Sequence, residues 1–485
     1  MAHGCSFAYP VPMSDPAHPD APLMLTVSGV RGIVGKTMTP EVAENFAAAF
    51  GIYVKSSSER DWPLLCLGRD SRPSGAELGE AVARGLARAG CDVVDLGVVA
   101  TPTVGVMIGQ RDAAGGMVVT ASHNPNPWNG LKCLNADGVA PPPDVAAQII
   151  RTYQENHSGR VDPGPAMNIA REDMANEIHV ARVLDVIESA PIRARKFKVM
   201  LDSVNGAGCV SGRMLLDHLD CRVIHLNGEP TGEFAHTPEP TKANLTELAE
   251  RMKAEDAAVG FAQDPDADRL AIVDENGTYI GEEYTLVLAA KRILDMVAAT
   301  SGGGVVVATN LSTSRMIDDL AARYVGVEVV RTAVGEANVV EALKQAGDRG
   351  LIGGEGNGGV ILPRVCWVRD SLSSMALVLS LLAAEGRPLS EIVADLPHYV
   401  MIKKKYDLSA IGGRDAVGPM LEKVKKHYAH ERINDADGVR VDVTDGWVHL
   451  RTSNTEPIVR LIAEAKTEAG VVARIDEVSD LASLT

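Results

Sequence analysis

Aromatic side chains, cysteine pairs and long apolar runs are all scarce in this chain. Phe, Trp and Tyr make up only 4% of the 485 residues, so the cores have to be built from the aliphatic residues within the 46% hydrophobic content. No apolar run approaches the roughly 18–20 residues of a bilayer span, which excludes a membrane-spanning helix. Residues 1–22 lack the basic start and the apolar stretch of a signal peptide, and we expect them to form a disordered extension.

Positive charge is scarce as well. The chain has 64 acidic and 47 basic residues, which gives a net charge of −17. Such a protein is repelled by nucleic-acid backbones and anionic membranes, so we expect neither as a partner. A local basic pocket for a phosphorylated small molecule remains compatible with this charge. The seven cysteines form no C-x-x-C pair, a pattern typical of a reduced, cytoplasmic protein.

Strand-like and helix-like segments alternate from Leu23 onward, and the same rhythm restarts near residues 198 and 304. One example is the predicted helix Pro40–Lys55, which Thr39 caps and which has proline at its first position. Such alternation predicts mixed or parallel sheets covered by helices. In the tail, a long helix at Arg414–Tyr428 is followed by several strands. We therefore predict an α/β fold with three similar mixed-sheet domains, at residues 23–165, 166–292 and 293–396, and a smaller α+β domain at 397–485.

Ser122 stands at the end of an apolar run, inside a cluster of turn-forming residues. The run Gly115–Thr120 predicts a short buried strand, and Asn124-Pro125 then stops any helix and fixes a loop. Open α/β sheets bind ligands at the carboxyl ends of their strands, so Ser122 lies where a nucleophile is expected. Taken alone, a serine in a polar loop is usually unreactive, so this interpretation depends on the other motifs.

Three carboxylates follow a second apolar run, Val259–Ala262. Asp264, Asp266 and Asp268 alternate along the chain, and alternate residues of an extended segment project to one side. Close together they repel one another unless a cation joins them, and an all-oxygen set suits Mg²⁺. A calcium loop does not fit, because the twelve-residue spacing is absent. A solvated acidic turn is the alternative, which the immediate return to apolar residues at Leu270 weakens.

Two further loops carry side chains suited to a phosphorylated sugar. Gly353–Gly359 holds five glycines, which let a backbone approach a ligand closely, and Glu355 and Asn357 alternate within it to offer a carboxylate and an amide to sugar hydroxyls. Arg451 offers a two-pronged donor to a phosphate, and small donors follow at Ser453, Asn454 and Thr455. Each loop alone is equally compatible with an ordinary turn.

Three arginines follow predicted strands near the start of the chain. Arg31 lies among glycines after the first predicted strand, Leu23–Ser28, and we consider it a candidate for the site. Arg69 and Arg72 follow the second strand, and we expect both to pair with acidic neighbours in a structural role.

Taken together, the four loops resemble those of the α-D-phosphohexomutase superfamily, which includes phosphoglucomutase, phosphomannomutase and phosphoglucosamine mutase. Thr120–Pro125 resembles its phosphoserine loop, Asp264–Arg269 its metal loop, Gly354–Gly359 its sugar-recognition loop and Arg451–Pro457 its phosphate-binding loop. The motifs occur in the family order, and the likeness covers nearly the whole chain. The resemblance implies four domains around a central cleft, each contributing one loop.

The resemblance also implies an activity, the transfer of a phosphoryl group within a hexose phosphate. Ser122 would carry a phosphoryl group, donate it to a hexose 1-phosphate, and take back the other group from the resulting 1,6-bisphosphate, which also serves as an activator. One Mg²⁺ per active site would be held by Ser122 together with Asp264, Asp266 and Asp268. The partner is a small phosphosugar, and we expect a monomer or a homodimer.

Further roles follow from the same resemblance. Arg31 and Arg269 would add positive charge near the reacting phosphate. Lys132 would be the general acid or base, and His123 would assist it or order the loop. Glu355 and Asn357 would hold the 3- and 4-hydroxyls of the sugar. The phosphate that is not reacting would be gripped by Arg451, Ser453, Asn454 and Thr455.

One departure from the family pattern concerns the sugar loop. Many bacterial members end this loop with Ser-Gly-His, whereas here it ends Asn357-Gly358-Gly359, so a histidine contact is missing or comes from elsewhere. The form found here resembles the branch associated with phosphoglucosamine mutases, whereas the Ser-Asn-Thr of the phosphate loop also occurs in phosphomannomutases and phosphoglucomutases. The sequence therefore favours glucosamine phosphate as substrate, with mannose or glucose phosphate as the alternative.

Two other classes of protein remain open. The Asp-x-Asp pattern at Asp264 also occurs in phosphatases with an aspartyl nucleophile. Those enzymes place it on the first strand, whereas here it follows a complete α/β unit. A non-catalytic sensor would bind sugar phosphates in the same cleft without turnover, although every group expected for the chemistry is present.

Overall fold

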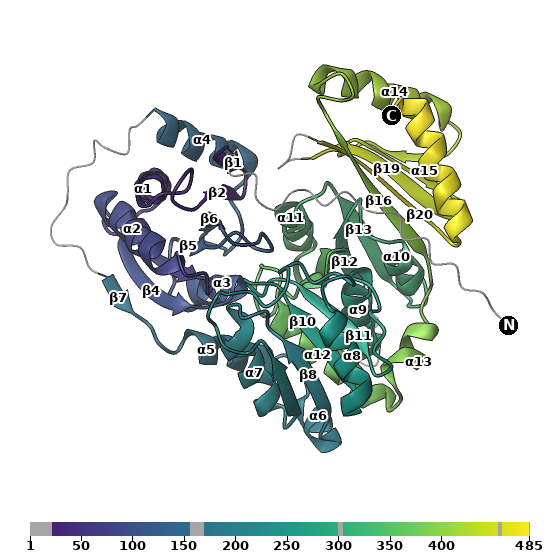
Figure 1. Cartoon of the computed structure of the whole chain (residues 1–485), viewed down its shortest axis with the longest axis horizontal. Coiled ribbons are helices and arrows are strands. Elements are labelled where there is room, and N and C mark those ends of the chain that lie inside the picture. The colour runs from purple at the N-terminus through teal and green to yellow at the C-terminus, as the bar shows by residue number, and fades with distance from the viewer. Residues whose placement is uncertain (1–21, 156–168, 299–303, 454–457, 485) are drawn as a thin grey trace.

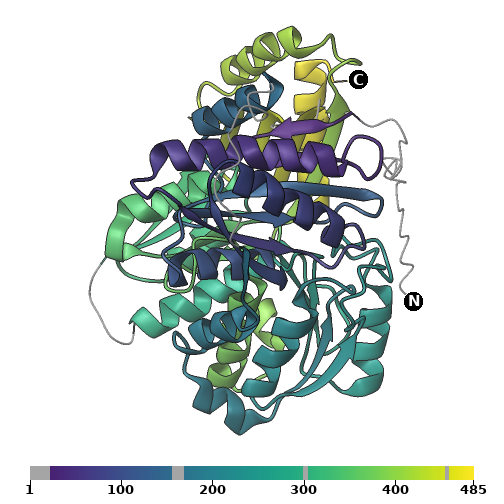
Figure 2. The same ribbon diagram turned by 90° about the vertical axis from the view of Figure 1, so that its left-hand side faces the viewer.

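The computed structural model describes residues 22–155, 169–298, 304–453 and 458–484, and it contains four sheets in four lobes. In Figure 1 the first lobe (purple to blue) lies at the left, the second (teal) at the bottom, the third (green) at the centre and the fourth (yellow-green) at the upper right. The view turned by 90° shows the first lobe above the second (Figure 2). The four-domain α/β architecture predicted from the sequence is confirmed.

The first sheet has seven strands in the order β1-β2-β6-β5-β3-β4-β7. Its strands are β1 (Met24–Thr26), β2 (Gly29–Ile33), β3 (Leu64–Arg69), β4 (Asp92–Val98), β5 (Gly115–Val119), β6 (Trp128–Asn135) and β7 (Ile169–Arg171). The helices of the first domain are α1 (Pro40–Ser57), α2 (Gly75–Arg88), α3 (Thr101–Gln110) and α4 (Pro143–Gln154). The predicted strand Leu23–Ser28 is cut short by the turn into β2. Strand β7 pairs with β4, so the first sheet continues past residue 165.

Strand β5, which leads to Ser122, is buried along its whole length. Met117 and Val119 belong to the apolar cluster that includes Phe46 of α1 and Leu86 of α2. Val118 belongs to the cluster on the other face, with Val104 and Met107 of α3 among its members. Since successive side chains of a strand point to opposite faces, this covering of both faces explains why β5 is uninterruptedly apolar.

The second and third sheets each have four strands. The second has the order β11-β10-β8-β9 and the third β13-β12-β14-β15. The second domain contains α5 (Ala175–Leu184), α6 (Ser189–Arg195), β8 (Lys198–Asp202), α7 (Gly208–His218), β9 (Arg222–Leu226), α8 (Thr246–Glu255), β10 (Val259–Gln263) and β11 (Leu270–Asp274). The third contains α9 (Glu283–Ala298), β12 (Val305–Asn310), α10 (Met316–Ala321), β13 (Val327–Thr332), α11 (Glu336–Ala346), β14 (Gly350–Glu355), β15 (Gly359–Ile361), α12 (Ser371–Glu385) and α13 (Leu389–Ala394).

One topology recurs in these three sheets. Each contains a unit of four consecutive strands, which are β3–β6, β8–β11 and β12–β15. In this unit the first strand lies between the second and the third and runs parallel to both, and the fourth returns antiparallel to the third. The turn between the third and fourth strands is β5–β6 in the first domain, β10–β11 in the second and β14–β15 in the third. Ser122, the aspartates and the glycine-rich loop occupy these three turns. The likeness between the units, visible in the sequence only as a common order of elements, is thus a likeness of topology that presents one polar loop per domain.

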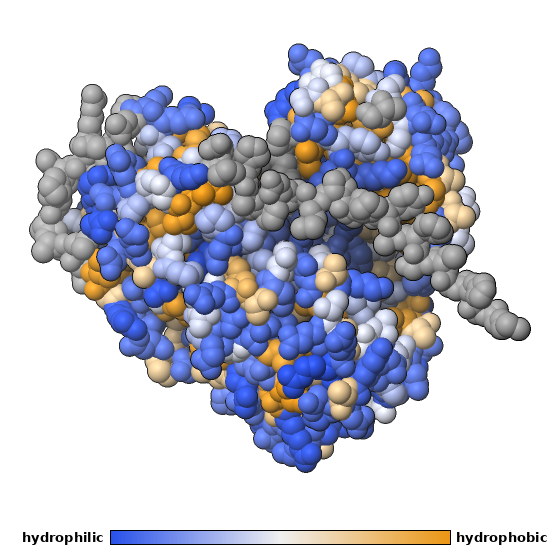
Figure 3. All heavy atoms as spheres, in the orientation of Figure 1, coloured by the Kyte–Doolittle hydropathy of each residue, from blue (hydrophilic) through white to orange (hydrophobic). Residues whose placement is uncertain are grey.

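The fourth domain is a five-stranded antiparallel sheet in the order β16-β20-β19-β18-β17. Its elements are β16 (Val400–Asp407), α14 (Val417–His427), β17 (Arg432–Asn434), β18 (Val439–Val443), β19 (Gly446–Thr452), β20 (Ile458–Ala465) and α15 (Glu468–Ala482). The predicted helix Arg414–Tyr428 begins as a 3-10 turn at Arg414–Ala416. Arg451 lies at the end of β19, so the fourth motif also follows a strand. The surface outline is notched between the first and fourth domains (Figure 3).

Helix α12 joins the second and third domains through a common core. Its residues from Ser371 to Leu382 are all buried, and its apolar side chains belong to a cluster that includes Phe261 of the second sheet and Val307 of the third. Asp370 caps the helix by accepting the N–H groups of Leu372 and Ser373. The cap therefore also fixes the direction of the backbone at Arg369, the residue just before Asp370.

No helix within the described ranges is long and apolar enough to cross a membrane.

Candidate active site

Ser122 is almost completely buried, with 1% exposure, and its backbone is left-handed, with φ of +53°. Its N–H donates to the Thr120 hydroxyl at 2.9 Å, and that hydroxyl donates to Asp70 at 2.6 Å. A non-glycine residue in this region is uncommon, and such strain persists where the surroundings impose it, often at functional sites. The turn after β5 thus holds the serine in one orientation.

Arg72 holds this turn in place through hydrogen bonds to its backbone. Its guanidinium donates to the carbonyls of Ser122 at 2.7 Å and Asn124 at 2.6 Å, and its Nε donates to Asp70 at 3.0 Å. Both members of this ion pair are fully buried. The structural role that the sequence predicted for Arg72 is confirmed, and the pair fixes the loop because the planar fork reaches several acceptors at once.

The three aspartates converge after β10. Their carboxylate oxygens lie within 4.8 Å of one another, and all three residues are buried. The reason inferred from the sequence was wrong, because the segment is a tight turn rather than an extended run. Ala267 has a left-handed φ of +53°, and this turn brings Asp266 and Asp268 beside Asp264. Thr101 at the start of α3 donates its hydroxyl to Asp266 at 2.6 Å.

The three buried carboxylates of this cluster lie close enough to repel one another. Burial, together with Asp268 and Asp266, raises the pKa of Asp264 well above its ordinary value. Burial acts to raise the pKa of Asp268 as well, but Arg369 and Lys132 outweigh it and lower that pKa. One oxygen of Asp266 and one of Asp268 are buried without a hydrogen-bond partner. An all-oxygen cluster with unused buried acceptors fits a small divalent cation such as Mg²⁺.

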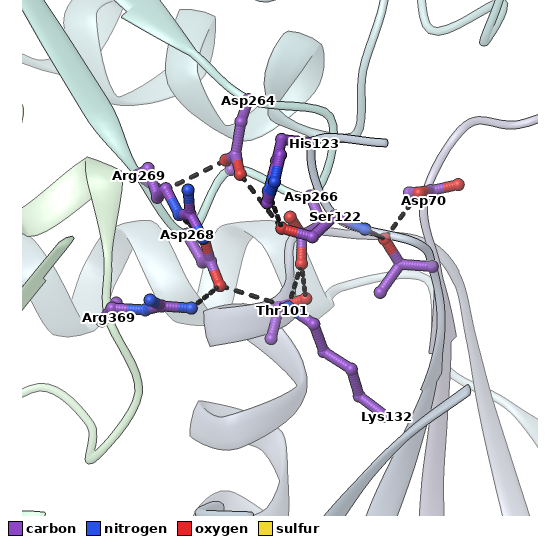
Figure 4. A network of polar contacts seen from close by, with 12 residues as sticks. Asp70, Thr101, Ser122, His123, Lys132, Asp264, Asp266, Asp268, Arg269 and Arg369 are labelled. Carbon is purple, nitrogen blue, oxygen red and sulfur yellow. Dashed lines mark hydrogen bonds and ion pairs between the residues drawn. The ribbon is translucent and has the colours of Figure 1, made fainter. Parts of the chain in front are cut away.

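Ser122 and the metal loop meet, although 142 residues separate Ser122 from Asp264. The Ser122 hydroxyl lies 3.5 Å from Asp264 Oδ2 and 3.4 Å from His123 Nδ1 (Figure 4). Burial, with Arg269 and Arg31 nearby, lowers the pKa of His123 well below its ordinary value. His123 is therefore a neutral imidazole beside the serine, able to order its hydroxyl or accept a proton.

Lys132 extends from β6 to the other side of the triad (Figure 4). Its ammonium lies 2.5 Å from Asp266 Oδ2 and 3.2 Å from Asp268 Oδ2. Burial acts to lower the pKa of Lys132, but the two carboxylates outweigh it and raise that pKa. In this arrangement the lysine is charged at neutral pH, so it is a proton donor rather than an acceptor.

Arg31 and Arg269 border the same group. Arg31 lies in β2 and donates to the Asn124 side chain at 3.1 Å. The Arg269 N–H donates to Asp264 Oδ1 at 3.2 Å, and its Nε lies 3.7 Å from Asp268 Oδ1. That Nε is buried without a hydrogen-bond partner. Both residues thus place positive charge near the triad, and their role toward a reacting phosphate stays a prediction.

The sugar loop follows β14 in the third domain. Glu355 is 6% exposed, and its carboxylate accepts from the Asn310 side chain at 2.8 Å and from Asn357 at 3.4 Å. The two side chains therefore lie together, as their spacing predicted. Arg369 joins this loop to the metal loop, because it donates to Glu355 at 2.9 Å and to Asp268 at 2.7 Å.

The sequence indicated neither Arg369 nor Thr101 as a site residue. Both act on loops of another domain, which no local pattern can reveal. The one available signal for Arg369 was the charged pair Arg369-Asp370 immediately before the apolar stretch of α12.

The phosphate loop lies in the fourth domain. The Arg451 side chain is 5% exposed and donates through Nε to Asp437 at 2.8 Å. Its Nη2 is buried without a hydrogen-bond partner, so one donor remains for a ligand. Asp437 Oδ2 also accepts the Val334 N–H of the third domain at 3.0 Å. The Ser453 N–H donates to Ile458. Asn454 and Thr455 lie outside the described residues.

Glu283, the first residue of α9, lies beneath the sugar loop. Its Oε2 accepts the Ser314 N–H at 2.9 Å, and a Cβ on Gly356 would lie 2.0 Å from that oxygen. Burial raises the pKa of Glu283 to about 8, although Lys403 acts to lower it. At neutral pH this carboxyl is therefore protonated in the folded protein and supports the loop as a neutral group.

The contribution of Glu283 to stability should fall as the pH rises from 4.5 to about 8, so over this range the stability of Glu283→Gln should fall less, or rise more, than that of wild type. A carboxyl with a raised folded pKa binds its proton more tightly in the folded state, so its contribution is complete at low pH and is lost as the pH passes the folded pKa. Thermal unfolding midpoints across this range would measure the slope. Glu341→Gln, at an exposed position of α11, is the control, and parallel curves for wild type and Glu283→Gln would contradict the prediction.

Three mixed sheets with equivalent polar turns, a fourth domain bearing a buried arginine, and a serine beside an aspartate triad define the architecture of an α-D-phosphohexomutase. Models of all four domains of the phosphoglucomutase/phosphomannomutase family match the chain, the three α/β/α domains at residues 23–160, 177–277 and 281–399 and the C-terminal domain at 413–481. The chain belongs to this family, and it is a phosphohexomutase, an isomerase that moves a phosphoryl group within a hexose phosphate.

Similar proteins carry names that refer to different sugars. A phosphoglucomutase/phosphomannomutase of Thermococcus kodakarensis is 37% identical over 443 residues, which cover 91% of this chain and 94% of that protein. A probable phosphoglucosamine mutase of Methanopyrus kandleri is 36% identical over 466 residues, 94% of this chain and 96% of that protein. The structure of a phosphoglucomutase/phosphomannomutase family protein of Burkholderia thailandensis aligns with a TM-score of 0.82 at 27% identity, over 95% of this chain and 97% of that one.

Proposed function

We propose that this phosphohexomutase interconverts glucosamine 6-phosphate and glucosamine 1-phosphate through a phosphorylated Ser122 and a 1,6-bisphosphate. The alternative substrates are mannose and glucose phosphates. Support for glucosamine comes from the Gly-Asn-Gly-Gly form of the sugar loop and from relatives named phosphoglucosamine mutase. The relative named phosphoglucomutase/phosphomannomutase keeps the alternative open.

The observation that carries the proposal is the meeting of Ser122 with the aspartate triad. The serine hydroxyl lies 3.5 Å from Asp264, in a turn whose backbone and side chains hold it in place. A phosphoryl group on Ser122 would add two negative charges beside three carboxylates, so the site demands positive charge at this point. Arg31, Arg269 and Lys132 supply part of it.

Asp264, Asp266 and Asp268, with an oxygen of Ser122 or its phosphate, would hold Mg²⁺. When bound, the ion supplies neutralising charge to the phosphoryl group during transfer. The unused buried oxygens of Asp266 and Asp268 support this assignment.

The other residues act on the substrate. Lys132, whose ammonium is held charged at the triad, would donate a proton to the oxygen that the phosphoryl group leaves, on the sugar or on Ser122. The neutral His123 imidazole would accept the proton of the attacking hydroxyl. Glu355 and Asn357 would hold two sugar hydroxyls. Arg451 would grip the phosphate that is not reacting, with the unpaired Nη2 as a donor. Since the hydroxyls and this phosphate are gripped separately, the bisphosphate can be bound in either orientation.

Two measurements test the proposal on the purified protein. Intact mass should show a fraction about 80 Da heavier than the unmodified chain, as expected for one phosphoryl group on serine. A turnover panel of glucosamine, mannose, glucose and N-acetylglucosamine phosphates, with Mg²⁺ and a bisphosphate present, should give the largest kcat/KM for glucosamine. Preference for mannose or glucose would favour the alternative. Binding without turnover would indicate a sensor. Net phosphate release that persists in Ser122→Ala would indicate a phosphatase.

That the protein is cytoplasmic, and a monomer or a homodimer, remains a prediction.

A further inference from the structure

Arg369 links two loops from different domains through one buried guanidinium. Its side chain is 11% exposed, and Nη2 contacts Asp268 while Nη1 contacts Glu355. Glu355 lies in the sugar loop of the third domain and Asp268 in the metal loop of the second. A single planar group therefore fixes one carboxylate proposed to hold the sugar and one proposed to hold the metal.

The stem of Arg369 fills the space beside Gly359. A Cβ on Gly359 would lie 2.2 Å from the Arg369 Cδ and 2.9 Å from its Cγ, far inside van der Waals contact. Residue 359 is thus restricted to glycine by this neighbour, not by its own backbone. This is also the position at which the resemblance leads one to expect a histidine. Any side chain at 359 would exclude Arg369 from its present place.

The backbone of Arg369 is held by contacts of its own. Its N–H donates to Glu336 Oε1 at 2.7 Å, an oxygen that also lies 3.8 Å from the Arg369 Nε. The next residue, Asp370, donates its N–H to Val360 at 2.8 Å and caps α12. The Asp370 carboxylate also lies 3.2 Å from His179 of the second domain. The side chain therefore starts from a rigid point, so removal of the guanidinium alone leaves the segment in place.

The two contacts fix how each carboxylate is turned. Asp268 Oδ2 accepts hydrogen bonds from both Arg369 and Lys132, while its Oδ1 has no hydrogen-bond partner and lies 3.7 Å from the Arg269 Nε. Glu355 receives Arg369 on one oxygen and Asn310 on the other. Arg369 thus holds the carboxylates of Glu355 and Asp268 in one orientation before a substrate binds.

We propose that Arg369 is a positioning residue that orients Glu355 toward the sugar hydroxyls and ties the sugar loop to the metal loop, in the space that a side chain on residue 359 would otherwise occupy. This inference rests on the proposed function. Through Arg369, the loop that recognises the sugar and the loop that binds the metal beside the reacting phosphate are held in a fixed position relative to each other.

Arg369→Met tests the proposal, because methionine keeps an unbranched stem beside Gly359 and removes the guanidinium. The readout is kcat/KM for a hexose 1-phosphate that wild type turns over, compared with its 3-deoxy and 4-deoxy analogues. With the normal sugar we expect a loss of about 100-fold, the effect of a misplacement on the order of 1 Å. Wild type should discriminate against the deoxy analogues, which lack a hydroxyl that Glu355 is proposed to hold. Arg369→Met should lose most of that discrimination, because its Glu355 is no longer placed to contact this hydroxyl in the normal sugar.

Three companion variants and one double variant complete the test. Arg364→Met removes a charge from the exposed part of the same connection and should stay within about twofold of wild type, as surface substitutions usually do. Gly359→Ala should resemble Arg369→Met, and the double variant should be little worse than either, since both act through one group. Arg369→Lys should restore activity only in part, because an ammonium cannot serve two carboxylates as a fork does.

The outcomes separate cleanly. Equal losses for the normal and deoxy sugars would show a merely structural role and overturn the proposal, as would full activity of Gly359→Ala. If wild type turned over no hexose phosphate, the proposed function would fail first and this inference with it.

Discussion

Replacement of Ser122 by alanine should reduce mutase turnover by on the order of 1,000-fold or more, even with added bisphosphate. The hydroxyl is the only group in the proposed mechanism that carries the phosphoryl group, and it lies 3.5 Å from Asp264 in a turn that positions it. A bisphosphate cannot replace it, because one phosphoryl group has to reside on the enzyme at the start and at the end of each turnover, and Ser122 is the group that donates it to the monophosphate and takes the other back from the bisphosphate. A coupled turnover assay and intact mass would show loss of activity together with loss of the heavier species.

Ser122→Gly separates chemistry from backbone strain. Ser122 has a left-handed φ of +53°, a conformation that glycine adopts at little cost. If alanine inactivated the enzyme by straining the turn, glycine would restore turnover. If the oxygen is required, both variants should be equally inactive while thermal unfolding stays cooperative. Full activity of either variant would contradict a phosphoserine mechanism.

The location of Ser122 and of the triad could be predicted from the sequence because both signals are local. An apolar β-branched run followed by a polar turn indicates the carboxyl end of a strand, and that end faces a ligand in an open α/β sheet. β5 and β10 end just before Ser122 and Asp264. The pairing of these two turns across domains came only from the family resemblance, since no local pattern specifies which domains meet.

Other features could not be predicted, each for a physical reason. Helix α12 is buried on all sides, so it lacks the apolar and polar faces by which a surface helix is recognised. The convergence of the aspartates depends on the left-handed Ala267, a residue type that rarely indicates such a turn. Arg369 acts through carboxylates far away in the sequence, so its function is set by tertiary structure alone. For Arg72 the pairing with an acidic neighbour was predicted, but its contacts with the carbonyls of Ser122 and Asn124 were not.

Asp264→Asn should abolish Mg²⁺-dependent turnover and yet raise the thermal stability of the metal-free protein. Burial and the neighbouring Asp268 and Asp266 raise the pKa of Asp264 well above its ordinary value, so its negative charge is unfavourable without a cation. Asparagine keeps the shape and removes the charge, which relieves the repulsion. It also removes one of three carboxylates and lowers the affinity for the ion. Activity and stability should therefore change in opposite directions.

Thermal unfolding with Mg²⁺ and with a chelator measures both effects. In wild type the ion should raise the midpoint, since binding at 100 times Kd stabilises a folded protein by about 2.7 kcal/mol. In Asp264→Asn this increase should be mostly lost, and the chelated variant should unfold at a higher temperature than chelated wild type. The excess should grow with pH above the ordinary aspartate pKa, because a carboxyl with a raised folded pKa loses its stabilising proton as the pH rises.

Asp274→Asn is the matched control for this test. Asp274 is also a buried aspartate of the β10–β11 hairpin, 5% exposed, but its Oδ1 accepts the N–H groups of Asn276 at 3.0 Å and Thr278 at 2.7 Å. Its substitution should weaken that turn and lower the midpoint equally with and without Mg²⁺, while turnover stays near wild type. If Asp264→Asn behaved in the same way, the carboxylates would not be acting as a cation site, and the neutralising charge would have to come from Lys132, Arg31 and Arg269 alone.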